Sequence, residues 1–582
     1  SMELVRFRYY RYPHTDSCGG ASVSAHYYRR INVRDRALIT AIFTGLGVVT
    51  LFNLPLSLYL WVPTAELQWL LYPVVESILA LWMVHVAVIH SRRLYRVLAG
   101  VLVGIWGGLS AAEAFFRFFY ARSFSLRGDL PMVKGALLLF FGEIGPIVNL
   151  ITPVTIVVIL TVLSISGWIV VHAAAVILKN VPWTMTSLLV TTGIALVPIW
   201  VVGTPSSITA TTISSAIHAG RENLITLESI TEAADGENAA DETDLQEAPI
   251  YRLPGIKDRD VYVFLIEAYG YASVSRPVLA EQIDPWRNRL ESALNEKGYH
   301  VATRYLESPV AGGYSWLADS TFLTGQWINS QERFLQLYDA NVPSLSGTLH
   351  DAGYYTYTIR PGTVHEPWPE GWDLFKFEES TIAYGGTFDY HGPRFSYVSV
   401  PDQYAIWTGH RKIQELIAPD GEAANRPLLA YFQLVSSHTP FTRIPPLIKE
   451  WDALGNGKIY NQRADEILEF NNSWTGGTQL IEGYTASISY VFSVLTDYVE
   501  NIMDHERDPI IIILGDHEPQ RPIRSSQSVL SVPLHIATRD EGILRCLLER
   551  GFDQGIHPVQ PPPHDRLSSF FPTIVEIARN CK

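Results

Sequence analysis

The most constraining feature of this sequence is a series of long apolar stretches confined to its N-terminal third. The first of them, residues 37–62, contains no charged residue, and it exceeds the length of about 20 apolar residues that a helix needs to cross a bilayer. We therefore predict a transmembrane domain over residues 37–203. Its five predicted spans are residues 37–62, 67–90, 97–120, 151–178 and 183–202. Residues 132–148 are apolar but interrupted by glycine, glutamate and proline, which predicts an interfacial helix.

Basic residues predict the orientation of these spans. Four arginines between Arg29 and Arg36 precede the first span, and Arg92, Arg93 and Arg96 follow the second. Short loops rich in lysine and arginine stay on the cytoplasmic side. We therefore expect a cytoplasmic tail over residues 1–36 and an uncleaved anchor, because no small-residue cleavage site follows the first apolar stretch. The chain after residue 203 then faces the periplasm or exterior of a bacterial cell from its inner membrane.

Charge and cysteine content exclude two classes of protein. The net charge of −14 argues against a nucleic-acid partner, which requires a basic surface. The chain has only three cysteines, and the predicted topology places Cys18 inside and the other two, Cys546 and Cys581, outside. Neither a disulfide-stapled fold nor a cysteine-based zinc site is therefore expected.

The polar remainder of the chain divides into a linker and a second domain. Residues 204–250 contain nine acidic residues between Glu222 and Glu247 and few large apolar groups, as is typical of an exposed segment. Residues 251–582 alternate short apolar runs with helical stretches. The runs are VYVFLI at 261–266, YYTYTI at 354–359, LLAYFQLV at 428–435 and PIIIIL at 509–514. This pattern predicts an α/β domain with a buried, mostly parallel sheet and helices on both faces.

Chemically active side chains directly follow these four runs. Glu267 follows the first, Arg360 the second, Ser436, Ser437 and His438 the third, and Asp516 and His517 the fourth. In open α/β sheets, ligands bind beyond the carboxyl ends of the strands. The sequence therefore predicts a site at this edge of the sheet.

Two carboxylates and an imidazole form a ligand set suited to Zn²⁺ or Mn²⁺. Glu267, Asp516 and His517 supply it, and Ser315 can complete it, because a metal-bound hydroxyl loses its proton easily and becomes a nucleophile. Ser315 follows Gly312 and Gly313 and is expected to open a helix, whose N-terminus attracts phosphate or sulfate. The alternative for each residue is structural: a cap, a solvated carboxylate, a packing histidine or an ordinary turn.

A second group of residues is expected to contact the substrate. His438, in the sequence SSHTPF, could serve as a general acid or donate to a phosphoryl oxygen; the alternative is a hydrogen-bonded core histidine. Arg360 could hold an anion with its planar guanidinium. His365, Trp368 and Trp372 in the segment after Arg360 could shape a head-group pocket, although Trp and Pro also pack long loops without binding a ligand.

Together, the five spans, the outward α/β domain, Ser315 at a helix start and the SSHTPF and LGDHEP segments resemble the membrane-anchored alkaline phosphatase/sulfatase superfamily. Within it the chain is most similar to lipid A phosphoethanolamine transferases and lipoteichoic acid synthases, which are phosphoglycerol transferases. The resemblance implies one divalent metal, Zn²⁺ first with Mn²⁺ or Mg²⁺ as alternatives, on Glu267, Ser315, Asp516 and His517. It implies that His438 contacts the substrate and that Arg360 and Trp368 lie in the region of the head-group contacts.

The function that this resemblance implies is a two-step transfer. Ser315 attacks the phosphorus of a membrane phospholipid donor, and the phosphoethanolamine or phosphoglycerol group then passes to an envelope glycan or lipid acceptor. One alternative is a metal-dependent phosphodiesterase or sulfatase that hydrolyses an envelope ester, and another is a non-catalytic, lipid-sensing scaffold.

The chain also departs from these families. The related transferases usually present threonine where this chain has Ser315. The ethanolamine enzymes carry several disulfides that this chain cannot form, and a second histidine after the GDH segment, where this chain has Arg521 and Arg524. The Cys/Ser-x-Pro-x-Arg signature of true sulfatases is absent around Ser315, which disfavours hydrolysis of sulfate esters.

Overall fold

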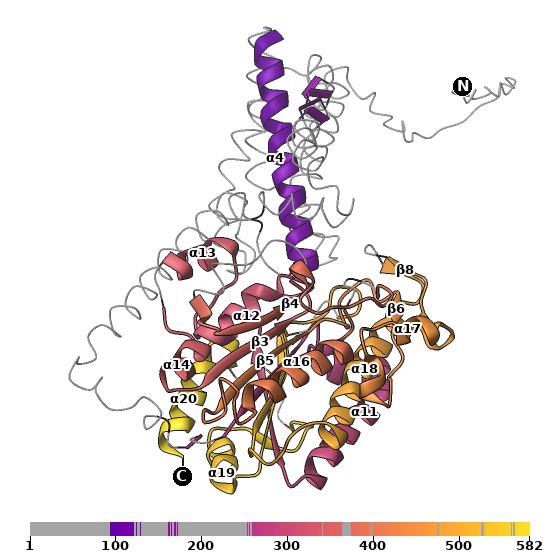
Figure 1. Cartoon of the computed structure of the whole chain (residues 1–582). Coiled ribbons are helices and arrows are strands. Elements are labelled where there is room, and N and C mark those ends of the chain that lie inside the picture. Colours follow the sequence, from indigo (N-terminus) through magenta and orange to yellow (C-terminus); the bar gives the residue numbers. More distant parts are fainter. Residues whose placement is uncertain are drawn as a thin grey trace, which may run out of the picture.

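The computed structural model describes residues 93–120, 259–339, 342–363, 374–395, 400–473, 476–524, 529–559 and 565–581, with a few single positions between these ranges. Most of the described residues form an α/β domain, from which the helix α4 (Arg93–Tyr120) extends (Figure 1).

A mixed sheet of nine strands, counted within the described residues, is the centre of this domain. Its spatial order is β12-β2-β11-β10-β1-β5-β3-β4, and β13 also pairs with β2. The five strands from β10 to β4 are parallel to one another, whereas β11 runs antiparallel to both β10 and β2. The strand bounds are β1 Val261–Ile266, β2 His300–Glu307, β3 Tyr355–Arg360, β4 Glu379–Ile382, β5 Leu428–Leu434, β10 Ile510–Gly515, β11 Ser531–Thr538, β12 Asp553–Gln554 and β13 Asp565–Arg566.

Helices cover both faces of this sheet, as the sequence predicts (Figure 1). In β1, Tyr262, Phe264 and Ile266 join one apolar core, and Val261, Val263 and Leu265 join the other. The first core is shared with α11 (Pro277–Glu296), α16 (Asp402–Ile417) and α18 (Leu480–Asn501). The second is shared with α12 (Ser315–Thr324), α14 (Leu345–Asp351), α19 (Glu541–Glu549) and α20 (Phe570–Asn580). Since successive strand residues point to opposite faces, the continuous apolar runs are explained by burial on both sides.

Shorter elements complete the domain. They are α10 Ala272–Ser275, α13 Gln331–Asp339, α17 Ile459–Gln462, and the two-residue ladders β6 Arg443–Ile444 with β7 Leu468–Glu469 and β8 Asn472–Ser473 with β9 Gly476–Gly477.

All four predicted strands are present and shift by at most one residue at either end. The prediction of an α/β domain with a mostly parallel sheet is confirmed, with an antiparallel part at β11 and β2 that the sequence did not indicate.

The N-terminal predictions are largely untested. The predicted tail, the spans 37–62, 67–90 and 183–202, the interfacial helix 132–148, the linker 204–250 and most of the span 151–178 lie outside the described residues. The span predicted at 97–120 lies within α4 and is helical. In the described part of the chain, no helix combines the length and the apolar character needed to cross a membrane. The five-helix bundle and the domain boundaries therefore stay predictions.

A disulfide joins Cys546 of α19 to Cys581, the residue that follows α20. It pairs the two cysteines that the predicted topology places on the same side. A single bridge of this kind fastens the C-terminal helix, while the two apolar cores account for most of the packing.

Candidate active site

The neighbouring strands β1 and β10 place two of the predicted metal ligands side by side. Ile266 and Gly515 are partners in this parallel pair, so the residues that follow them, Glu267 and Asp516, leave the sheet together. Only glycine fits at position 515, because a Cβ there would lie 1.8 Å from the carbonyl oxygen of Tyr269. This close approach joins the two ligand-bearing turns.

Ser315 is the first residue of α12 and faces these ligands. Its Oγ donates a hydrogen bond to Glu267 Oε2 at 2.8 Å and lies 3.3 Å from His517 Nε2. Gly312 and Gly313 before it have φ angles of 68° and 142°, which glycine adopts without the steric cost borne by other residues. The predicted position of the serine at a helix start is confirmed.

The distances among the four residues fit a divalent metal. His517 Nε2 lies 3.3 Å from Glu267 Oε1 and 3.5 Å from Asp516 Oδ2. One ligand atom from each of these three residues can be chosen so that all lie within 4.8 Å of one another. Ligand atoms bound tetrahedrally to Zn²⁺ at about 2.1 Å are separated by about 3.4 Å. The oxygen and nitrogen donors also match the preferences of Zn²⁺ and Mn²⁺.

Outer hydrogen bonds orient these donors. Asp516 Oδ1 accepts from the backbone N–H groups of Ala268 at 2.8 Å and His517 at 2.6 Å, so Oδ2 remains to face the site. His517 Nδ1 lies 2.9 Å from the carbonyl oxygen of Glu518. A proton on Nδ1 donates to that carbonyl and leaves the Nε2 lone pair for a metal, as is usual for histidine ligands.

The buried ligands shift one another's pKa values. Burial and the charge of Glu267 raise the pKa of Asp516 to about 8. Burial by itself lowers the pKa of His517, but Asp516 and Glu267 raise it to about 9. Two neighbouring carboxylates ionise together only beside a cation, so the charges of Glu267 and Asp516 suit a divalent ion.

His438 is brought to the same site by the loop after β5. Asp402, buried at the start of α16, accepts from the N–H groups of Val435 and Ser436, and Ser437 Oγ donates to the carbonyl oxygen of Glu267. His438 Nδ1 donates to the carbonyl oxygen of Thr439 at 2.6 Å. Burial would raise the pKa of Glu267, but the neighbouring His438 and His517 lower it.

Tyr397 is a site residue that the sequence did not indicate. Its ring stacks on the His438 imidazole with centroids 3.8 Å apart and planes at 16°. Burial and the charge of Glu267 raise the pKa of its hydroxyl to about 12. No motif marks this tyrosine, which reaches the site from the segment before α16.

The structure places Arg360 in a buried ion pair. Its Nη1 donates to Asp319 Oδ2 at 2.5 Å, and Tyr431 donates to the other oxygen of the same carboxylate. The exposed fractions of the Arg360 and Asp319 side chains are 3% and 0%. The anion-binding role predicted for Arg360 is untested, and His365, Trp368 and Trp372 lie outside the described residues.

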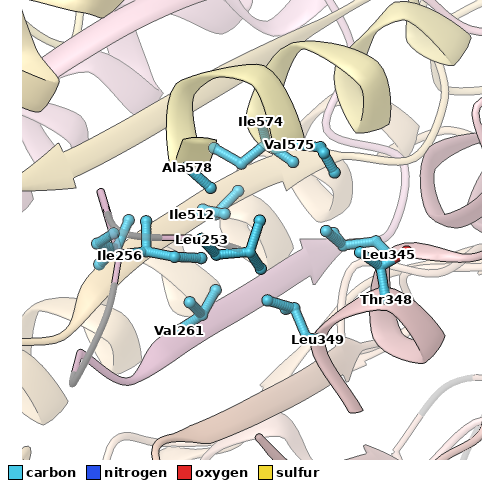
Figure 2. Close-up of a pocket in the computed structure, with 11 residues that line it drawn as sticks. Leu253, Ile256, Val261, Leu345, Thr348, Leu349, Ile512, Ile574, Val575 and Ala578 are labelled. Carbon is cyan, nitrogen blue, oxygen red and sulfur yellow. The ribbon is translucent and has the colours of Figure 1, made fainter. Parts of the chain in front are cut away.

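An apolar pocket lies at the amino ends of the parallel strands, at the opposite end from the polar cluster. It is lined by the amino ends of β1 and β10, including Val261 and Ile510, and by side chains of α14 and α20 such as Leu345 and Ile574 (Figure 2). Apart from Thr348, its lining is apolar. The pocket is thus separate from the polar cluster at the carboxyl ends of the strands.

No protein-family model matches the sequence, and no curated protein is significantly similar to it. Among solved structures, the lipoteichoic acid synthase LtaP from Listeria monocytogenes is similar with 14% identity and a TM-score of 0.36 over 56% of this chain and 74% of that one. The C-terminal periplasmic domain of EcEptC from Escherichia coli has 12% identity and a TM-score of 0.36 over 55% and 82%. The Streptococcus pyogenes phosphoglycerol transferase GacH has 13% identity and a TM-score of 0.35 over 61% and 92%.

These structures are of the kinds that the sequence motifs resemble. At such identities and TM-scores, the similarity carries no information about the activity or substrate of this chain.

Proposed function

We propose that this protein is a metal-dependent transferase that moves a phospho-head-group from a membrane phospholipid to an envelope glycan or lipid through a covalent intermediate on Ser315. The observation that carries the proposal is the position of Ser315 Oγ, 2.8 Å from Glu267 Oε2 and 3.3 Å from His517 Nε2 at the N-terminus of a helix. A hydroxyl that only capped the helix would not need three buried ionisable neighbours.

In the first step, Ser315 Oγ attacks the phosphorus of the donor, and the bond from phosphorus to the diacylglycerol oxygen breaks. Glu267 Oε2, which accepts the hydrogen bond of Oγ, is in place to receive its proton. His438 donates a proton to the departing diacylglycerol oxygen. The positive end of α12, where Ser315 is the first residue, stabilises the phosphoryl oxygens.

A divalent metal held by Glu267, Asp516, His517 and Ser315 would supply Lewis-acid chemistry, favouring the serine alkoxide and neutralising phosphoryl charge. In the second step, an acceptor hydroxyl attacks the phosphorus on Ser315, and the bond from phosphorus to Oγ breaks. His438 removes the proton of the acceptor, and Glu267 returns its proton to Oγ. His438 therefore acts as a general acid in the first step and as a general base in the second.

The lipid donor and the location belong to the same proposal. The apolar stretches before residue 203 support a multi-pass protein of the bacterial inner membrane. The Cys546–Cys581 disulfide supports an oxidising compartment for the α/β domain. We infer that this domain faces the periplasm or cell exterior, where a phospholipid of the outer leaflet can reach Ser315.

Covalent labelling tests the proposal. The purified full chain is incubated with phosphatidylethanolamine or phosphatidylglycerol, each carrying a labelled head group, and the peptides are analysed by mass spectrometry. We expect a phospho-head-group on Ser315, a loss of turnover of several orders of magnitude in Ser315→Ala, and partial activity in Ser315→Thr, which retains a hydroxyl.

Ser320→Ala is the matched control. Ser320 lies on the same helix, but its Oγ donates to the carbonyl oxygen of Trp316, so this variant should still form the adduct. An adduct on another residue, or substantial turnover by Ser315→Ala, would refute the nucleophile. Release of the head group to water in the presence of envelope lipids and glycans would favour a phosphodiesterase instead.

A further inference from the structure

The residue before the nucleophile has an unusual backbone conformation. Tyr314 has φ 64° and ψ 38°, in the left-handed region, and no side chain caps the helix that follows. Residues other than glycine enter this region at a steric cost. Surrounding contacts must therefore hold Tyr314, and with it the direction in which Ser315 leaves the loop.

The C-terminal end of α4 supplies such contacts. The Tyr120 carbonyl oxygen accepts a hydrogen bond from Ala311 N–H at 3.2 Å. The Tyr120 ring meets the Tyr314 ring edge-on, with centroids 4.9 Å apart at 85°, and the Phe116 ring lies 6.2 Å from the same ring. A Cβ on Gly313 would lie 3.2 Å from Tyr120 Cε1. The end of α4 thus packs directly on the loop that carries the nucleophile, and Figure 1 shows this end of the helix next to the α/β domain.

Two further hydrogen bonds hold the loop, one from the backbone of Gly312 and one from the hydroxyl of Tyr314. Gly312 N–H donates to the carbonyl oxygen of Glu518 at 2.8 Å, one residue beyond the ligand His517. The Tyr314 hydroxyl donates to Asp129 Oδ1 at 3.3 Å, and Asp129 is 4% exposed. The loop is therefore clamped between the metal-ligand segment and residues that precede the α/β domain in the sequence.

We propose that Tyr120 is a positioning residue that holds Tyr314 in its left-handed conformation and so fixes Ser315 Oγ against Glu267 and His517. The catalytic consequence of this inference rests on the proposed function. The contact between Tyr120 and Tyr314 does not depend on that function. It also gives α4 a role in the reaction beyond that of an anchor.

Hydrogen exchange tests the contact without any requirement for activity. The full chain, the Tyr120→Ala variant and the Leu102→Ala variant are compared in detergent micelles. Leu102 is the control because it lies on the same helix and its side chain is 52% exposed. We expect faster exchange at the amides of residues 311–315 in Tyr120→Ala only, with unchanged exchange in β1 and β10. Unchanged exchange at 311–315, or an equal change in Leu102→Ala, would overturn the proposal.

Steady-state kinetics with bis(4-nitrophenyl) phosphate tests the consequence. We expect Tyr120→Ala to lower kcat about 10- to 100-fold, because displacement of a reacting group by about 1 Å can have this effect. KM should change less than about twofold, with the metal content unchanged. Tyr120→Phe, which retains the ring, should restore kcat to within about threefold of the wild type.

The combined variant Tyr120→Ala/Tyr314→Ala should lose no more activity than the more severe single variant, because both changes remove the same contact. Fully multiplicative losses, or a kcat of Tyr120→Ala equal to that of the wild type, would refute the positioning role. If Ser315 of the wild type stays unlabelled but the amides of residues 311–315 exchange faster in Tyr120→Ala, the proposed function is refuted. The contact between Tyr120 and the loop is then still supported.

Discussion

Binding of Zn²⁺ to the metal-free protein at pH 7 should release about two protons from the buried ligands. Burial and Glu267 raise the pKa of Asp516 to about 8, and the two carboxylates together raise that of His517 to about 9 despite its burial. Burial would raise the pKa of Glu267, but His438 and His517 lower it to about 2. Asp516 and His517 are therefore mostly protonated at pH 7, whereas Glu267 is ionised.

The same values fix how strongly metal affinity depends on pH. Because Asp516 and His517 must lose their protons before they bind the metal, affinity at pH 7 should lie well below its limiting value. Around pH 7 the affinity should rise about 100-fold per pH unit. Near pH 8.5 the number of released protons should fall to about one.

Titration calorimetry at pH 7 in buffers with different ionisation enthalpies counts these protons directly. Asp516→Asn removes one titrating group and should reduce the count by about one, while Ser320→Ala should leave it unchanged. If Ser315 binds as an alkoxide, its proton adds to the count, and Ser315→Ala removes that contribution. A count below about 0.5, or the same count at pH 7 and pH 8.5, would refute the assignment of these residues as protonated ligands.

Two further predictions concern stability. Asp319→Ala leaves the buried Arg360 guanidinium without its carboxylate and should lower the free energy of unfolding by about 3–5 kcal/mol in urea titrations. The double variant Asp319→Leu/Arg360→Met should recover most of this loss. A loss below about 1 kcal/mol in Asp319→Ala would contradict the role of this pair. Burial lowers the pKa of His535 to about 3. Below the ordinary histidine pKa of about 6.5, only the unfolded chain therefore binds a proton at this residue. The free energy of unfolding should then fall by up to about 1.4 kcal/mol per pH unit as the pH decreases. His535→Gln should flatten that dependence in urea titrations between pH 7.5 and 4.5, and an unchanged slope would show that other groups control it.

The parallel part of the sheet could be predicted because its strands are buried on both faces and therefore read as continuous apolar runs. β2 and β11 could not, because His300, Arg304 and Glu307 interrupt the first and Pro533 and His535 the second. Their pairing depends on contacts between distant segments, with Pro533 facing Tyr305, and no local pattern indicates these contacts.

The grouping of the predicted metal ligands follows for a similar reason. Residues that follow neighbouring parallel strands must meet at one edge, which is sufficient to group Glu267 with Asp516 and His517. Arg360 also follows an apolar run in the sequence, but its partner Asp319 is on α12, and the sequence does not reveal that the ion pair is buried. Tyr397 was missed because its position over His438 depends on the path of a loop rather than on a motif.

The contact between α4 and the nucleophile loop bears on how the α/β domain can be studied in isolation. A shortened protein that begins at residue 251 would keep both apolar cores and every predicted metal ligand, yet it would lack Tyr120 and Asp129. Water would then replace an aromatic ring behind Tyr314. Such a fragment could fold and bind metal, but its loop of residues 311–315 would be less restrained. Rates of turnover measured on it would therefore set a lower limit for the intact chain.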